Sequence, residues 1–465
     1  MLKKQHIVLL IMFLLGTTFA KEIKVSPGVN AIAQAYATAE AGDVLVLTTG
    51  YEEGNYSTGY IEEKLIEITK DITIKAADDL TTKPVIFPVS TSKLFSIMAG
   101  LNLDGIVVDG RKPNGDITTL YNIIYMKVDT SLTKIVSDDF SLRINNCVLK
   151  NMDKDKAKVM YSSDNNQATL DSIIITNTVI KDINGFGMYF KTTKSKHHPG
   201  TFRYLKWENC LVTNLGGSQG RMGIISAAYV NELENVPEVL VNHVTFANVN
   251  ASDDAKGSEL YVTDCNAVIQ NCIAVNIKND ADSMKIFYNV ADTVVSGNPP
   301  RTVIQNCLKH TNTPYYGFIA DTLINNFNAD PMFVDSANGD YTLKEGSIGK
   351  NAATDGLDLG YIPGGLSVGV DDEVTELPET FELSQNYPNP FNPSTVISFS
   401  IPNSGITKLS VYNILGQKVA TLVNKELSAG SYQYEFDASN LTSGVYFYKL
   451  SSNNYSAIKK MMLVK

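Results

Sequence analysis

Tryptophan, cysteine and positive charge are all scarce in this chain of 465 residues, and each scarcity excludes a class of protein. There is one Trp, and 39 Lys and Arg stand against 49 Asp and Glu, which gives a net charge of −10. A nucleic-acid partner is therefore not expected, because phosphate binding needs a basic surface. Five Cys in so long a chain form no disulfide scaffold, and the odd number leaves at least one thiol unpaired.

Long apolar runs are also missing, apart from one near the N-terminus. Lys3 and Lys4 precede the apolar run 7–15, and small residues follow as far as Ala20. The run is too short to cross a bilayer comfortably, and the pattern is typical of a secretory signal peptide at 1–20. No later stretch is apolar enough to span, so we expect an exported chain without a transmembrane segment once the signal is cleaved.

What the sequence does contain is a repeat in its middle. Aliphatic and polar residues alternate around a shared Asn, which recurs at intervals of 29 to 35 residues, at Asn146, Asn177, Asn209, Asn242, Asn271 and Asn306. Alternation with a period of two indicates strands, and no copy shows the apolar stripe of a helical repeat. Stacked units of this kind predict a right-handed parallel β-helix over residues 21–363, with one coil per repeat.

The position after each shared Asn predicts a column of stacked side chains. Its members are Cys147, Thr178, Cys210, His243, Cys272 and Cys307. Equivalent positions of successive coils lie about 4.8 Å apart, so we predict that all five Cys are interior packing residues rather than nucleophiles. His243 is predicted to be a satisfied histidine rather than a ligand. A second column, in bends where left-handed dihedrals suit Asn, is predicted at Asn151, Asp182, Asn214 and Asn276.

The two ends of the repeat region resemble those of a class of secreted bacterial enzymes. The Ala-rich segment 29–42 predicts a short helix that covers the first coil, and a strand follows from Asp43. With the closing segments 328–335 and Asp355–Gly360, the region resembles polysaccharide-lyase β-helices of the chondroitinase-B and alginate-lyase kind. The resemblance implies a fold more than a reaction, because the motifs of chondroitinase-B-like enzymes and of pectate lyases are absent from the sequence.

The C-terminal residues indicate a different module. Residues 364–380 are acidic and predict a solvated linker, and the clean alternation that follows predicts a small antiparallel immunoglobulin-like β-sandwich at 381–465. The fold class is therefore all-β. The segments with the strongest resemblance to the type-A sorting domain of the type IX secretion system are Phe381–Thr395, Val411–Val419, Leu441–Tyr446 and Lys459–Lys465.

This resemblance implies passage across the outer membrane of a Bacteroidetes-like bacterium. The type IX secretion machinery would then be a partner of the C-terminal domain, and the protein would be secreted or attached to the cell surface. A carbohydrate-binding module is the alternative for the sandwich, since such modules share its architecture.

One insertion of the predicted solenoid is basic although the region around it is acidic. It lies between the coils of Asn177 and Asn209 and holds Lys191, Lys194, Lys196, His197, His198 and Arg203. A lyase of uronate-containing glycans needs a base of lowered pKa, a cation for the carboxylate and an acid for the leaving oxygen. We therefore predict as catalytic residues Lys194, Lys196 and Arg203. Substrate binding is predicted for His197, His198 and Arg221. A solvated basic loop explains the same residues without any site.

An acidic loop offers oxygen ligands for a metal, at Asp253, Asp254, Glu259 and Asp264. These side chains could bind Ca²⁺, but their spacing is not that of an EF-hand, and a solvated loop fits equally. No other cofactor is predicted. Two functions stay open: a lyase that cleaves an acidic polysaccharide by β-elimination, and a non-catalytic, adhesin-like protein that binds glycans. In both cases we expect a monomer with polysaccharide as its partner.

Overall fold

The computed structural model divides by its internal contacts into two units, residues 1–367 and 368–465. The described residues are 20–126, 141–162, 170–190, 202–218, 220–226, 237–250, 260–263, 265–278, 285–290, 301–310, 317–366, 381–386, 389–401, 405–414, 417–427, 430–439, 441–452 and 455–464. The predicted signal peptide therefore lies outside the described residues, except for Ala20. Within the described part of the chain, no helix is long and apolar enough to cross a membrane.

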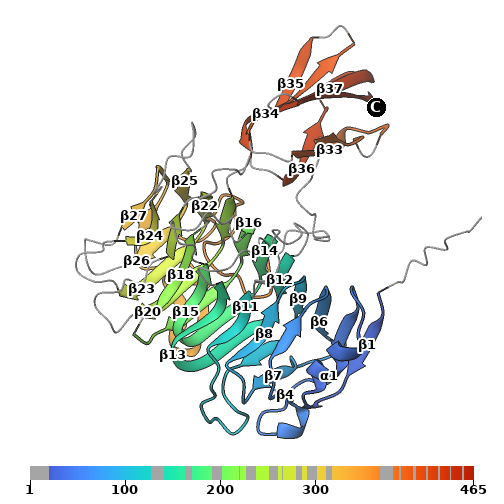
Figure 1. Cartoon of the computed structure of the whole chain (residues 1–465). Coiled ribbons are helices and arrows are strands. Elements are labelled where there is room, and N and C mark those ends of the chain that lie inside the picture. The colour runs from blue at the N-terminus through green and yellow to red at the C-terminus, as the bar shows by residue number, and fades with distance from the viewer. Residues whose placement is uncertain are drawn as a thin grey trace, which may run out of the picture. The chain divides into compact units, whose positions relative to one another are not determined.

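The first unit is a stack of coils that contribute strands to three faces (Figure 1). Face 1 is an 11-stranded sheet in which every neighbouring pair is parallel. Its strands, in spatial order, are β1 (Glu22–Val25), β3 (Val44–Leu47), β6 (Ile72–Ala76), β9 (Leu101–Asp104), β12 (Ser141–Asn145), β14 (Leu170–Thr176), β16 (Phe202–Glu208), β19 (Glu238–Asn242), β22 (Asn266–Gln270), β25 (Thr302–Gln305) and β28 (Thr322–Ile324). The predicted parallel β-helix is thus confirmed.

Faces 2 and 3 are two rows of one 18-stranded sheet, joined because two long strands run through both. These strands are β13 (Val148–Ser162) and β15 (Val179–Phe190). Face 2 contains their first halves and β2 (Gly28–Val29), β4 (Tyr60–Glu62), β7 (Val85–Pro88), β10 (Val107–Asp109), β17 (Leu211–Leu215), β20 (Thr245–Asn250), β23 (Ile273–Lys278), β26 (Leu308–His310) and β29 (Phe327–Asn328). Face 3 contains their second halves and β5 (Ile66–Ile68), β8 (Lys93–Ile97), β11 (Asn122–Met126), β18 (Arg221–Ser226), β21 (Leu260–Thr263), β24 (Lys285–Val290) and β27 (Gly317–Ile319).

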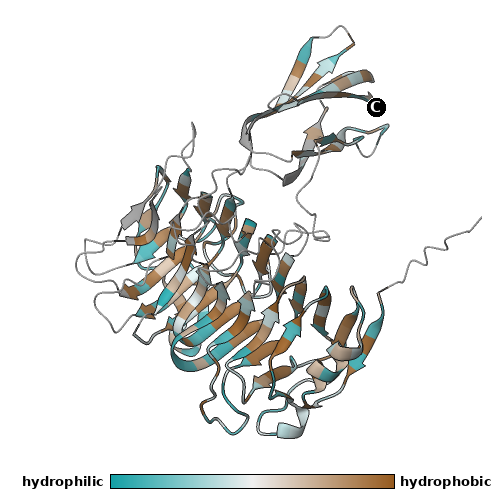
Figure 2. Cartoon of the chain, viewed as in Figure 1, coloured by the Kyte–Doolittle hydropathy of each residue, from teal (hydrophilic) through white to brown (hydrophobic). Residues whose placement is uncertain are grey.

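Hydrophobic residues alternate with polar ones along many of these strands (Figure 2). The hydrophobic side chains form a core inside the coils. All five Cys are buried and free, as predicted, although Cys265 lies outside the column of the other four. Burial raises the pKa of Cys147 to about 12, and it also raises the pKa of Cys210 and of Cys307. These thiols therefore carry no thiolate at neutral pH and act as packing groups.

One coil of the predicted alignment is shifted by a residue. The strand register pairs Asn242 with Glu208 and Gln270, so His243 takes the left-handed position with a φ of 51°. The column of cysteines consequently continues through Val244, and the prediction of His243 in that column was wrong. The coil of Asn242 has Asn and His in consecutive positions, and His is one of the few residues that tolerate left-handed dihedrals.

Two ladders of side-chain amides link the coils at the bends. In the first ladder, Asn209 Nδ2 donates to Asn177 Oδ1 at 2.8 Å. In the second, Asn214 Nδ2 donates to Asp182 Oδ1 at 2.9 Å, and Asn248 Nδ2 donates to Asn214 Oδ1 at 3.1 Å. The second column was therefore predicted correctly but lacked Asn248, which lies five residues after His243 as the shifted register requires.

Helix α1 (Ala31–Thr38) covers the N-terminal end of the coils, where Ile32 and Tyr36 join the core. A short 3-10 turn, η1 (Tyr56–Thr58), follows on the same end of the chain. Glu62 Oε1 accepts a hydrogen bond from the Ile32 N–H at 2.8 Å, whereas Glu62 Oε2 is buried without a partner. Burial raises the pKa of Glu62 to about 7, and the backbone N–H groups of α1 oppose this rise.

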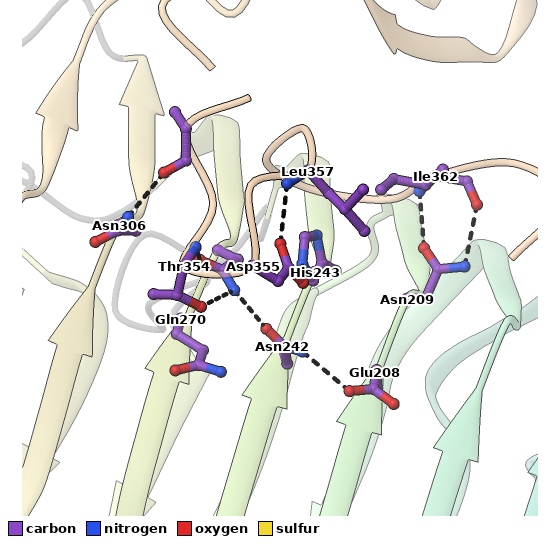
Figure 3. A network of polar contacts seen from close by, with 12 residues as sticks. Glu208, Asn209, Asn242, His243, Gln270, Asn306, Thr354, Asp355, Leu357 and Ile362 are labelled. Atoms are coloured by element: carbon purple, nitrogen blue, oxygen red, sulfur yellow. Dashed lines mark hydrogen bonds and ion pairs between the residues drawn. The ribbon is translucent and has the colours of Figure 1, made fainter. Parts of the chain in front are cut away.

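The last part of the first unit, residues 329–366, is named the closing segment. It begins with an antiparallel pair, β30 (Phe333–Asp335) and β31 (Asp340–Leu343), which flank the turn η2 (Ser336–Asn338). Its apolar side chains then pack on face 2, where Tyr341 and Leu359 are buried. The segment runs back across earlier coils, since Asn306 Nδ2 donates to the Ala352 carbonyl and Asn209 Nδ2 to the Ile362 carbonyl (Figure 3).

The second unit is a sandwich of two antiparallel sheets, as predicted. One sheet contains β32 (Glu382–Leu383), β33 (Ser394–Ile401) and β36 (Gly430–Asp437). The other contains, in spatial order, β35 (Lys418–Leu427), β34 (Gly405–Asn413), β37 (Gly444–Ser452) and β38 (Tyr455–Leu463). Phe399 of the first sheet and Tyr448 of the second are buried in a single core.

Candidate functional site

Face 3 presents a column of tyrosines along the first unit. The strand register aligns, on successive coils, Tyr125, Tyr161, Tyr189, Ile224 and Tyr261. All five side chains are half-buried, whereas the neighbours of Tyr161 and Tyr189 along their strands are fully buried. This alternation means that the column points away from the core, and we call it the tyrosine column.

The rings of the tyrosine column contact one another from coil to coil. The ring centroids of Tyr125 and Tyr161 are 5.6 Å apart, and those of Tyr161 and Tyr189 are also 5.6 Å apart. Phe186 meets Tyr189 edge to face at 5.0 Å. Each Tyr lies between two inward side chains, so the pleat of the strand points it outward. The contacts with neighbouring rings then fix the orientation of its own ring.

A second column, whose charged members are half-buried, lies three residues earlier on the same coils. Its members are Lys93, Asn122, Lys158, Phe186 and Arg221. Lys158 is half-buried between the fully buried Ala157 and Val159, which shows that it points outward. We call this set the cation column.

The lysines of the cation column lie over the tyrosine rings. Lys93 Nζ is 3.4 Å from the Tyr125 centroid, and Lys158 Nζ is 4.9 Å from that of Tyr161 and 5.3 Å from that of Tyr189. Such contacts hold an ammonium at a fixed place on the surface. Burial and then the neighbouring Lys156 ammonium lower the pKa of Lys158.

The outward polar groups of face 1 differ, because they bind each other along the sheet. Lys206 pairs with Glu208 at 2.6 Å, and Asn145 Nδ2 donates to Asp104 Oδ1 at 2.9 Å. These pairs satisfy part of the polar surface of face 1, whereas Arg143 Nη1 is buried there without a partner. Face 3 is the face on which aromatic rings and cations gather among the described residues of the coils.

The structure separates two residues that the sequence grouped. Arg221 lies in the cation column on face 3, in register with Phe186. Arg203 lies on face 1 near the start of β16, exposed and 3.8 Å from Asp171. An exposed pair at this distance contributes little to stability.

The remaining predicted site residues lie outside the described residues. These are Lys194, Lys196, His197 and His198 in the basic insertion, and Asp253, Asp254, Glu259 and Asp264 in the acidic loop. The insertion follows Phe190, so it connects the end of the face 3 strand that carries Tyr189 to β16. Among described residues, no three His, Cys, Asp or Glu side chains gather as metal ligands.

His243 is part of the framework rather than of face 3. Its ring is fully buried, its Nε2 lies 2.8 Å from Asp355 Oδ2 of the closing segment, and its Nδ1 has no partner (Figure 3). The sequence predicted a satisfied histidine, and one of the two ring nitrogens of His243 is satisfied.

Sequence reasoning missed the tyrosine column and most of the cation column. The available signal was a repeated triplet of Tyr between two apolar residues, as at Tyr125, Tyr189 and Tyr261. The intervals along the aligned column are 36, 28, 35 and 37 residues, because insertions of different length separate the coils. An alignment centred on Asn therefore did not reveal it.

Comparison with known proteins identifies the C-terminal region. Residues 385–465 match the family of secretion system C-terminal sorting domains. This finding confirms the predicted sorting domain and indicates export through a secretion system. No curated protein is significantly similar to the chain.

Two solved structures are similar to the chain, both of the PL6-family alginate lyase AlyGC, one of them a point mutant. The TM-scores are 0.49 for the mutant and 0.47 for the other structure, and the sequence identity is 22% in both cases. The similarity covers 67% of this chain but only 38% and 40% of those chains, so this chain spans less than half of their length.

Proposed function

We propose that this chain is an exported β-helix protein that holds an acidic polysaccharide on face 3. The observation that carries the proposal is the tyrosine column with cations beside it. Aromatic rings offer flat apolar surfaces on which the apolar faces of sugar rings can stack. Lysine and arginine beside them supply donors for carboxylate or sulfate groups.

The charge of the chain supports an anionic ligand in particular. The whole chain carries −10, yet face 3 places Lys93, Lys158 and Arg221 in one column. An acidic polymer would be repelled by most of the surface and attracted along this one. Because the cations of face 3 attract an anionic polymer and the acidic surface elsewhere repels it, the polymer is directed to face 3.

The reaction that these groups support is β-elimination at a uronate. A base takes the C5 proton, the C4–O bond breaks as the C4–C5 double bond forms, and the leaving oxygen takes a proton from an acid. Burial lowers the pKa of Lys158, which is the direction that a base requires, and the hydroxyl of Tyr161 or Tyr189 would be the acid. Arg221 would bind the carboxylate. The catalytic residues proposed from the sequence remain Lys194, Lys196 and Arg203, and His197 and His198 would bind the substrate. The acidic loop would bind Ca²⁺.

A non-catalytic glycan-binding protein is the second candidate, and a specific contact favours it. The Lys158 ammonium lies within 5.6 Å of three ring centroids, and its Nζ donates to the Lys156 carbonyl at 3.1 Å. Cation–π contacts of this kind stabilise the charged form, which cannot act as a base. The neighbours AlyGC and its mutant carry the name of a lyase, whereas the contacts of Lys158 are equally those of a binding surface.

Two measurements on the full chain separate these candidates. Binding to immobilised pectate, alginate and glycosaminoglycans tests the shared part of the proposal, and ultraviolet absorbance of the opened uronate ring tests cleavage. We expect binding to at least one acidic polymer and a loss of that binding in Tyr161→Ala. Binding without new absorbance, with and without Ca²⁺, would leave the non-catalytic candidate. Absence of binding to every acidic polymer would contradict both.

A further inference from the structure

Strand β13 contains extra residues at the bend between faces 2 and 3. It pairs with β15 in regular register except at residues 153–156, opposite which β15 has only Asn184. We call residues 153–156 the bulge. Within it Lys156 has a φ of 63°, a left-handed conformation that lysine rarely adopts. The chain therefore departs from the regular coil immediately before Lys158 of the cation column.

Two carboxylates of the bulge bond to coils on opposite sides of it. Towards the N-terminus, Arg111 Nε donates to Asp153 Oδ2 at 2.8 Å and Arg111 Nη2 donates to Asp153 Oδ1 at 2.9 Å. Towards the C-terminus, the Ser218 N–H donates to Asp155 Oδ1 and the Ser218 hydroxyl donates to Asp155 Oδ2, both at 2.7 Å. The Ser218 hydroxyl and then the Ser218 N–H lower the pKa of Asp155, so this carboxylate is charged at neutral pH.

The contact between Asp155 and Ser218 skips one coil. Strand β13 pairs with β15, and β15 pairs in turn with β17 and β18, so the coil of β15 lies between the two residues. The close approach needs a glycine in the turn. Gly217 has a φ of 78°, and a Cβ there would lie 2.9 Å from Asp155 Oδ1 and 3.1 Å from the Asn184 carbonyl oxygen. The turn therefore packs over Asn184 onto the bulge.

The turn that Asp155 holds leads into β18, whose first residue is Arg221 of the cation column. Its backbone is tightly packed, because a Cβ on Gly220 would lie 2.7 Å from the Gly216 carbonyl oxygen. Since Gly216 and Gly220 touch across the turn, a displacement of Ser218 would also move the start of β18.

The other end of the bulge holds Lys158. Lys158 Nζ donates to the Lys156 carbonyl at 3.1 Å, and it lies 5.6 Å from the ring centroid of Phe186 and 5.3 Å from that of Tyr189. Phe186 is in register with Lys158 on one side and with Arg221 on the other. The Lys158 ammonium therefore leans toward the coil that separates it from Arg221.

We propose that Asp155 is a positioning residue of face 3, which holds the start of β18 through Ser218 so that Arg221 and Lys158 bind one stretch of an acidic glycan together. This inference rests on the proposed function, and Asp155 acts through Arg221 without touching the ligand. Cations whose relative position is fixed beforehand lose little entropy on binding. The role runs against simple electrostatics, because an anion beside the site weakens the attraction of an anionic ligand.

The test compares two substitutions at Asp155 that remove the same charge. Asp155→Asn can still accept from the Ser218 N–H and donate to the Ser218 hydroxyl, whereas Asp155→Ala can make neither bond. Calorimetry uses the full chain, one fixed salt concentration and hexasaccharides of galacturonate, mannuronate and chondroitin sulfate, and the variants are measured with the probe that the parent binds most tightly. Asp155→Ala should lower the affinity about tenfold, and Asp155→Asn should stay within about twofold of the parent.

The second carboxylate of the bulge provides the matched control. Asp153→Ala removes a charge from the same segment but breaks the bond to Arg111, so it should leave the affinity within about twofold of the parent. Each variant is measured well below its thermal midpoint. An equal loss in Asp153→Ala and Asp155→Ala would show that any damage to the bulge lowers affinity, and it would overturn the assignment to Asp155.

A double-mutant cycle with Arg221 gives a readout that a general structural role would not move. In the Arg221→Gln background the positioned cation is gone, so Asp155→Ala should have little further effect on affinity. Additive losses would contradict the inference.

The outcomes also separate this inference from the proposed function. If both Asp155 variants bind more tightly than the parent while Tyr161→Ala and Arg221→Gln lose affinity, charge outweighs position, the inference is wrong and the proposed function stands. Unchanged affinity in Asp155→Ala with the same losses at Tyr161 and Arg221 has the same meaning. If no acidic probe binds the parent, both fail.

Discussion

Faces 2 and 3 belong to the same 18-stranded sheet, yet they differ in whether their outward side chains are covered by another part of the chain. The outward residues of face 2 include Leu211, Ile273 and Leu308, and the closing segment buries them. The outward residues of face 3 include four tyrosines that stay half-buried. The difference shows which surface the protein keeps for its own packing and which one it leaves to a ligand.

The chemistry of the side chains explains this division. Leu and Ile have no polar group, so a continuous strip of them on the surface must be covered or it becomes a site of association. Tyrosine has an apolar ring and a hydroxyl, and it tolerates contact with water and with a partner. A comparison of the two faces therefore separates residues that act on stability from residues that act on binding.

The largest expected effect is a loss of stability when the packing of the closing segment on face 2 is weakened. Leu359 is 1% exposed and packs in the cluster that contains Ile273 and Leu308. Leu359→Ala should lower the free energy of unfolding by about 2–4 kcal/mol, since it leaves a cavity. Glycan affinity should not change. Denaturant unfolding and calorimetry measure the two quantities, and Leu65→Ala, at a side chain that is 38% exposed, is the matched control.

The covered N-terminal end should differ from face 3 in its response to pH. Burial raises the pKa of Glu62 to about 7 in the folded chain, whereas the unfolded chain releases this proton near the ordinary glutamate pKa of 4.5. Stability from this group is therefore present at low pH and falls as the pH rises from about 4.5 to about 7. Glu62→Gln should remove the fall and be more stable than the parent at pH 8 by on the order of 2 kcal/mol. Equal pH profiles of unfolding in parent and variant would contradict the burial of this carboxylate.

Two tyrosines, one on each face, provide the sharpest contrast. Tyr161→Ala should reduce affinity for acidic glycan about tenfold and cost less stability than the loss of a fully buried ring, because its ring is only half-buried. The hydroxyl of Tyr341, in the closing segment, forms a hydrogen bond of 2.9 Å with the hydroxyl of Thr213 on face 2, so Tyr341→Phe should cost about 1 kcal/mol of stability and leave binding intact. If the two variants exchange these effects, the assignment of the faces is reversed.

The smallest effect concerns the charge of Lys158. Because burial lowers its pKa, the ammonium loses its proton at a lower pH than an ordinary lysine, and glycan affinity should fall as the pH rises toward that point. Lys158→Arg keeps its charge at every accessible pH and should retain affinity under the same alkaline conditions, a difference of a few-fold. Titrations of binding at neutral and alkaline pH measure it.

The repeated parts of the fold were predictable from the sequence, and the non-repeated parts were not. Shared Asn residues at similar intervals located the coils, and Cys147 and its equivalents marked the interior. The shift at His243 was hidden because Asn242, one position early, looks like the shared residue. The tyrosine column was hidden by the unequal intervals between its members.

The basic insertion shows a different limit of sequence reasoning. Its composition identified Lys194 and Lys196 as unusual in an acidic chain, but composition does not say which face a connection adjoins. The structure answers this through chain order, because the strand that precedes the insertion is β15, which carries Tyr189 on face 3. Their roles remain predictions that the glycan experiments can test.

The closing segment also sets an order of events when the chain folds. Neighbouring coils contact each other over about one repeat of sequence, so stacking can begin as soon as two coils exist. The bond from the Ile362 N–H to Asn209 Oδ1 spans 153 residues, and no earlier part of the chain can replace it. The part of face 2 that the closing segment covers must therefore stay open to solvent until nearly the whole first unit has been made, and its apolar strip is the surface that a newly made chain most needs to protect.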